Sequence, residues 1–113
     1  MPHCVIEYSK DLEQKVEIER VVEVVHQGAI QTKLFDIPAI KTRAIAYEHF
    51  QVGEGNLSFI HVAVKILAGR TKEQKSRLSE SIFTQLLELG TEDISLSVEV
   101  LDIDTDSYSK VIV

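Results

Sequence analysis

The residues of this 113-residue sequence that could do chemistry begin with the proline at position 2. Removal of Met1, which is usual before a small second residue, would turn Pro2 into an N-terminal secondary amine. An α-amine titrates near 7.7 to 8.0 in model compounds, at roughly the pH of most solutions, and burial or adjacent cations lower its pKa. Such an amine can remove a proton from a carbon beside a carbonyl group and return it elsewhere. The alternative is that Pro2 only protects the terminus.

Three cations are candidates for binding an anion. Lys41 and Arg43 are two positions apart in an expected strand and share one face, with Thr42 on the other. The alternative is an exposed edge strand protected by charge. Arg70 precedes Thr71, the expected N-cap of a helix, where a guanidinium and free backbone N–H groups suit a carboxylate. The alternative for Arg70 is a solvated loop arginine.

The histidines and the single cysteine give weaker indications. His3 could tune or gate the Pro2 amine, and His61 is expected in the core or an interface with its polar atoms satisfied. His26 and His49 are expected at the surface. No histidine and carboxylate pair has zinc spacing, and Cys4 has no CxxC partner. No phosphate-binding glycine motif occurs either, and we expect neither a metal site nor a disulfide.

The elements that must position these residues follow a repeated order. Strands are predicted at residues 2–8, 39–47, 58–66 and 94–103, helices at 11–28 and from Thr71 to Gly90, and a glycine-rich turn at 51–57. Gly28 and Gly90 are the expected C-caps, and Thr71 with Gln74 forms a capping box. The apolar helix stripes are Leu12, Val16, Val21, Val24 and Val25, then Leu78, Ile82, Phe83, Leu86 and Leu87.

This order is β-α-β twice, with the copies roughly 55 to 60 residues apart. It predicts an α+β fold, a double βαβ repeat in which a four-stranded sheet carries both helices on one face. Within 58–66, Ile60, Val62, Val64 and Ile66 point one way, and Phe59, His61 and Ala63 the other. Two helices cannot cover both faces, so we expect other subunits to cover the second.

Composition narrows the class of protein. The net charge of −6 argues against nucleic acid and anionic membranes as partners. No apolar run approaches the ~20 residues of a membrane span, and the N-terminus does not resemble a signal peptide. We therefore expect one domain spanning residues 1–113, in the cytoplasm.

Several segments together resemble the 5-carboxymethyl-2-hydroxymuconate isomerase family, a branch of the tautomerase superfamily that includes macrophage migration inhibitory factor. They are residues 2–9 (PHCVIEYS), Phe35, residues 39–43 (AIKTR), 59–61 (FIH) and 65–71 (KILAGRT), in matching order and spacing. The similarity extends from Pro2 to about Val100, and the conjunction of these segments is more specific than any one of them.

The resemblance implies a homotrimer with active sites between subunits and a cofactor-free isomerase or tautomerase of aromatic compound catabolism. Pro2 would be the catalytic base, and Lys41, Arg43 and Arg70 would bind a small anionic carboxylate substrate and stabilise charge developing on its oxygen. Lys41 stands where the family usually has arginine. The tail, which helps to line or close the family's site, is short here, at residues 107–113.

Two other classes of protein remain open on the residues alone. One is a non-catalytic trimeric module that keeps the fold and a carboxylate pocket. The other is a ferredoxin-like oligomerisation domain, which a scattered arrangement of Lys41, Arg43 and Arg70 would favour.

Overall fold

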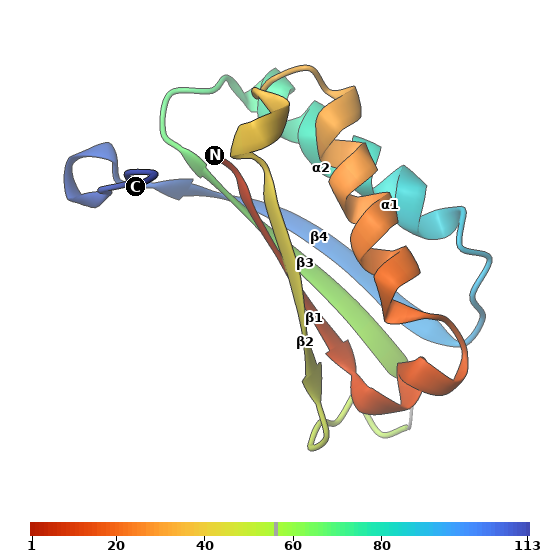
Figure 1. The fold of residues 1–113 in the computed structure, drawn as a ribbon. Helices are drawn as coiled ribbons and strands as arrows, with labels where there is room; N and C mark the ends of the chain where they lie inside the picture. The colour runs from red at the N-terminus through yellow and green to blue at the C-terminus, as the bar shows by residue number, and fades with distance from the viewer. Residues whose placement is uncertain (56) are drawn as a thin grey trace.

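The chain folds into one mixed sheet with two helices against one of its faces (Figure 1). The computed structural model describes residues 1–55 and 57–113; the predicted turn at 51–57 includes Asn56, which lies outside the described residues. The strands are β1 (His3–Ser9), β2 (Lys41–Tyr47), β3 (Ser58–Leu67) and β4 (Ile94–Ile103). The helices are α1 (Ile18–Gln31) and α2 (Lys72–Leu87), and 3₁₀ turns occupy Lys10–Gln14, Ile37–Ala39 and Thr105–Ser107.

The strand order is β2-β1-β3-β4, with β1 parallel to β2 and β3 parallel to β4. The two halves meet where β1 pairs antiparallel with β3 in the middle of the sheet. Helix α1 connects β1 to β2, and α2 connects β3 to β4, so each half is one βαβ unit. The predicted double βαβ repeat with both helices on one face is confirmed.

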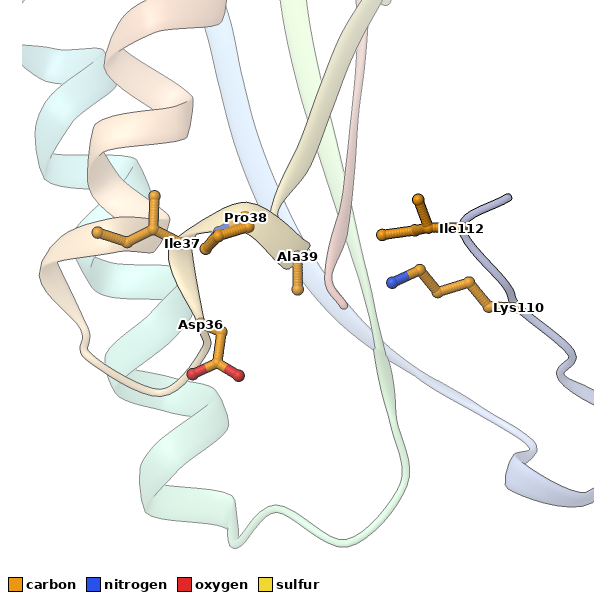
Figure 2. A pocket seen from close by; sticks show the side chains of 6 residues that line it. All are labelled: Asp36, Ile37, Pro38, Ala39, Lys110 and Ile112. Carbon is orange, nitrogen blue, oxygen red and sulfur yellow. The ribbon is translucent and has the colours of Figure 1, made fainter.

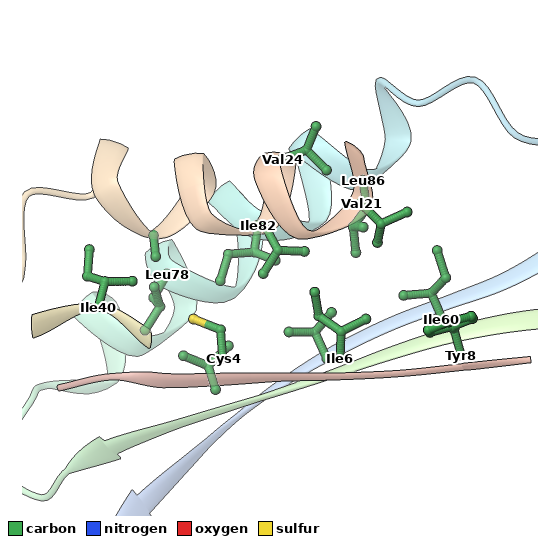
Figure 3. Packing of buried hydrophobic residues seen from close by; sticks show 14 of the residues in the cluster. Cys4, Ile6, Tyr8, Val21, Val24, Ile40, Ile60, Leu78, Ile82 and Leu86 are labelled. Carbon is green, nitrogen blue, oxygen red and sulfur yellow. The ribbon is translucent and has the colours of Figure 1, made fainter. Parts of the chain in front are cut away.

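The core lies between the sheet and the helices, as Figure 3 shows. Alternate residues of β3 are buried, which confirms the predicted assignment of Ile60, Val62, Val64 and Ile66 to the inner face. Cys4, Ile6 and Tyr8 of β1 point to the same side. Opposite them the helices contribute Val21, Val25, Leu78, Ile82 and Leu86, each fully buried.

The first helix differs from its prediction at both ends. It begins at Ile18, because residues 10–14 form a 3₁₀ turn that brings Leu12 into the core before the helix starts. Gly28 is not a C-cap: it lies inside α1, and a Cβ built on it would lie 2.9 Å from the Ile82 Cα atom. Glycine is therefore required by the close approach of α1 and α2, a contact that local sequence cannot reveal.

The second helix begins as predicted. Thr71 accepts from the Gln74 amide at 3.1 Å, and the Gln74 side chain accepts from the Thr71 amide at 2.9 Å. The helix ends at Leu87, before Gly90, whose φ of 68° reverses the chain. The predicted stripe is too wide, because Leu87 is 54% exposed and only Leu78, Ile82 and Leu86 are buried.

The other side of the sheet, here called the open face, is covered by neither of the two helices (Figure 1). It carries Ile45, Tyr47 and Leu101, which are 55%, 38% and 41% exposed. Alternation and register also place His3, Lys41, Arg43 and Lys65 on it. Neither described helix has the length and apolar character that crossing a lipid bilayer requires.

Candidate active site

Pro2 comes directly before β1, where the segment that leads into β2 holds the backbone around it. The Pro2 carbonyl accepts a hydrogen bond from the Lys41 amide at 3.0 Å, and the side chain is buried. The Met1 amino group donates to the Ala39 carbonyl at 2.7 Å. The amino terminus is therefore fixed against the turn that leads into β2.

Burial lowers the pKa of this terminal amine below its ordinary value of 8.0, and the nearby charges of Lys41 and Lys110 lower it further. Asp36 acts in the opposite sense as a smaller influence. This amine is that of Met1, and a Pro2 amine made by removal of Met1 would lie beside the same cations, which favour loss of its proton and suit it to act as a base.

Lys41 and Arg43 lie on the open face, as predicted, and Thr42 points to the helix side, where its hydroxyl lies 2.7 Å from His26 Nδ1. Lys41 Nζ donates to the Ala39 carbonyl at 3.3 Å. Within the described residues, none of the ion pairs involves Lys41, Arg43, Lys65 or Lys110. These cations are therefore available to an anionic ligand.

A pocket of about 460 Å³ lies beside the terminus, and Figure 2 shows its walls. The turn before β2 forms one wall, and Lys110 and Ile112 of the C-terminal tail extend toward it from the opposite side. The pocket is lined by Asp36, Ile37, Pro38, Ala39, Lys110 and Ile112.

Arg70 is engaged by the chain itself. Its guanidinium donates to the Leu34 carbonyl at 2.7 Å and lies over the Phe35 ring, 5.3 Å from the ring centre. It thus fixes the segment that leads into the pocket wall at 36–39. Of the predicted site residues, Pro2, Lys41 and Arg43 lie together at one end of the sheet. Arg70 instead contacts Leu34 and Phe35, before the pocket wall.

The histidines divide into two groups. On the open face, His3 contacts Arg43 and Tyr108, and His61 lies 2.7 Å from the Ser97 hydroxyl and 2.5 Å from a Glu99 carboxylate oxygen. Both ring nitrogens of His61 are thus satisfied, as predicted. His49 is exposed as predicted, but His26 is half-buried between α1 and β2, because it binds Thr42.

The family resemblance implies a tail near the site, but it does not single out Tyr108 or Lys110. Tyr108 is the one aromatic residue after Ile103, and a half-buried aromatic in a polar tail is a sign that the tail is attached to something. Lys110 stands before the apolar run at 111–113. Neither feature indicates that the tail returns to residues more than a hundred positions earlier.

Comparison with known proteins identifies the family to which the sequence is similar. The sequence profile described as "CHMI: 5-carboxymethyl-2-hydroxymuconate isomerase" matches residues 2–111. The 5-carboxymethyl-2-hydroxymuconate Delta-isomerase of Escherichia coli is 25% identical over 85 residues, which are 74% of this chain and 68% of that protein.

Solved structures share the fold. A 5-carboxymethyl-2-hydroxymuconate isomerase from Deinococcus radiodurans R1 superposes with a TM-score of 0.82 at 22% identity, covering 96% of this chain and 87% of that one. A structure described as a fused 4-OT wild-type symmetric trimer gives a TM-score of 0.69 at 17% identity, covering 94% and 91%. The tautomerase-like fold is confirmed, and the chain belongs to the 5-carboxymethyl-2-hydroxymuconate isomerase family, as an enzyme of the isomerase class.

Proposed function

We propose that this isomerase moves a proton within a small unsaturated hydroxy or keto acid similar to 5-carboxymethyl-2-hydroxymuconate, with Pro2 as the base. One observation carries the proposal: around the half-buried amino terminus, an acidic chain gathers cations that form no ion pair among the described residues. Such a surplus of positive charge suits a substrate with more than one carboxylate, and the family supplies the class of reaction.

The chemistry needs Pro2 to carry the free amine, which requires removal of Met1. The amine would take a proton from the substrate enol or from a carbon beside its carbonyl. It would then return the proton to another carbon of the conjugated system, so the amine ends as it began. Lys41 and Arg43 would bind carboxylate and stabilise negative charge on oxygen during transfer. Arg70 would contribute by holding the pocket wall and by its charge. The net reaction consumes no cofactor.

We further propose a homotrimer in which neighbouring subunits cover the open face. The exposed apolar side chains of Ile45, Tyr47 and Leu101 support an interface there. A protein of the same fold is described as a symmetric trimer, which supports this number of subunits. Sedimentation of a stable monomer at micromolar concentration would contradict the proposal.

The amine is tested by chemistry at the terminus. Mass spectrometry of protein from its native host should show loss of Met1. Processed protein should isomerise 2-hydroxymuconate or phenylenolpyruvate without added metal, at a rate that rises with pH as the amine loses its proton. Complete N-terminal acetylation should abolish turnover, because an amide has no basic lone pair. Pro2→Ala is not a fair test, since processing leaves it a primary amine.

Two results would contradict the mechanism. The first is complete retention of Met1 in the native protein, and the second is undiminished activity after complete acetylation. A fluorescence titration with the unreactive dicarboxylic acid succinate serves as the control. Acetylated protein that still binds succinate but does not turn over has lost the base and kept the pocket.

A further inference from the structure

His3 makes two hydrogen bonds that together determine where its proton lies. Its Nδ1 atom is 3.2 Å from a terminal guanidinium nitrogen of Arg43, and its Nε2 atom is 2.9 Å from the Tyr108 hydroxyl. Arginine can only donate, so Nδ1 must be an unprotonated acceptor. The neutral ring then carries its proton on Nε2 and donates it to the Tyr108 oxygen. The Tyr108 hydroxyl proton remains free for another acceptor.

The surroundings of His3 oppose a second proton. Lys41 and Lys65 lie directly opposite His3 on the two neighbouring strands. Burial lowers the pKa of His3 below 6.5 as the largest cause, followed by the charges of Arg43 and Lys41. The charged or titratable groups that face the ring from β1, β2, β3 and the tail are the Met1 amine, Lys41, Arg43, Lys65 and Tyr108. None of them is a carboxylate, so His3 is neutral near pH 7.

Tyr108 attaches the C-terminal tail to β1 through this ring. The two rings pack edge to face, with centres 6.0 Å apart and planes at 68°. Two residues further on, Lys110 reaches the pocket beside Ala39, and its charge acts on the terminal amine (Figure 2). The position of the Lys110 charge therefore depends on where Tyr108 is held.

We propose that His3 is the positioning residue of this site: its neutral, Nε2-protonated ring orients the Arg43 guanidinium and holds Tyr108. Through Tyr108 it fixes Lys110 beside the amino terminus. The effect on substrate binding rests on the proposed function; the ring's tautomer and the attachment of the tail do not. Protonation of Nδ1 would place one donor against another and break the contact with Arg43.

The tautomer is tested without a substrate. Nitrogen NMR of histidine-labelled protein at pH 7 should show one ring with a protonated Nε2 and an unprotonated Nδ1 that disappears in His3→Phe. A doubly protonated His3, or a proton on Nδ1, would overturn the proposal. Trypsin should cleave after Lys110 slowly in the wild type and at least several-fold faster in both His3→Phe and Tyr108→Phe. Equal cleavage rates would also overturn it.

The kinetic test uses the same variants and a histidine outside the site. Tyr108→Phe should raise KM for 2-hydroxymuconate about three- to tenfold, the range for loss of one hydrogen bond, with a smaller change in kcat. His3→Phe should raise KM at least as much, because it also loses the contact with Arg43. The double variant should be no worse than His3→Phe alone, because the connection that Tyr108→Phe breaks is already lost with the imidazole ring. His49→Phe should match the wild type. Simple addition of the two effects, or an unchanged KM, would refute the positioning role.

These results separate the two proposals. An enzyme inactive on every unsaturated acid, but with the expected tautomer and tail protection, would refute the proposed function alone. An active enzyme in which His3→Phe changes neither KM nor the rate of cleavage after Lys110 would refute the positioning role alone.

Discussion

Replacement of Arg70 by alanine should destabilise the protein, because this side chain fastens the segment before the pocket. Its 2.7 Å hydrogen bond to the Leu34 carbonyl is charge-assisted, a type worth about 1.5–3 kcal/mol. The contact over Phe35 adds about 0.5–1 kcal/mol at a partly exposed site. Partial exposure reduces both contributions, so Arg70→Ala should lower the free energy of unfolding by about 2 kcal/mol.

Urea denaturation at one fixed protomer concentration measures this loss, since subunit association makes apparent stability depend on concentration. Arg70→Lys should recover only part of it, because lysine keeps the charge but lacks the planar group that stacks on Phe35. Phe35→Leu should cost about 1 kcal/mol through the lost cation–π contact and aromatic packing. Arg20→Ala is the matched control: Arg20 pairs with Glu23 on an exposed helix surface and should cost less than about 0.5 kcal/mol.

The result that would refute this reasoning is an Arg70→Ala variant as stable as Arg20→Ala. It would mean that the contacts with Leu34 and Phe35 contribute nothing in solution and that the guanidinium is free. A rise in KM with unchanged stability would then favour direct contact of Arg70 with substrate. Loss of stability together with a raised KM fits a residue that holds the pocket wall.

Three further predictions concern the helix contact, the thiol and the pH dependence of stability. Gly28→Ala should lower the free energy of unfolding, measured in denaturant, by about 1–2 kcal/mol, because the new Cβ would lie 2.9 Å from the Ile82 backbone. Gln27→Ala, on the exposed side of the helix, should not lower it. A Gly28→Ala variant more stable than the wild type would contradict the close contact. Burial raises the pKa of the Cys4 thiol to about 11, so native protein should resist a thiol reagent at pH 8 and react once unfolded; rapid native reaction would contradict this. The pKa of His3 is below 6.5 in the folded chain, so the stability that the neutral ring contributes is fully present above pH 6.5 and is lost as the pH falls through the folded pKa. His3→Phe should therefore make the free energy of unfolding fall less steeply below pH 6.5. An unchanged dependence on pH would contradict the lowered pKa.

What could be predicted from the sequence depended on local patterns. Alternation identifies the buried face of β3, and the pair Thr71 and Gln74 identifies the start of α2, because each signal lies within a few residues. The shared face of Lys41 and Arg43 follows from strand alternation in the same way. The repeat of two βαβ units then determines the sheet without knowledge of any distant contact.

The features that sequence did not reveal depend on contacts between distant segments. Gly28 resembles a C-cap until Ile82, 54 positions later, is packed against it. Arg70 has the expected place before α2, but its guanidinium is satisfied by a carbonyl 36 positions earlier. The tail returns to His3 across 105 positions. Residue spacing within one segment carries no information on such pairs, so only the three-dimensional structure identifies them.

The register of the sheet explains how an acidic protein makes a cationic site. Pairing places Lys41, His3 and Lys65 in one row across β2, β1 and β3, with Arg43 on the same face two positions further along β2. The neutral His3 ring separates the two lysines, and the chain's 18 acidic residues offered many possible partners for these cations. In the described structure the carboxylates that form ion pairs do so elsewhere, with Lys10, Arg20, His61 and Lys75. Among the described residues, these cations therefore have no carboxylate partner at this end of the sheet, and an anionic substrate is the kind of ligand that would pair with them.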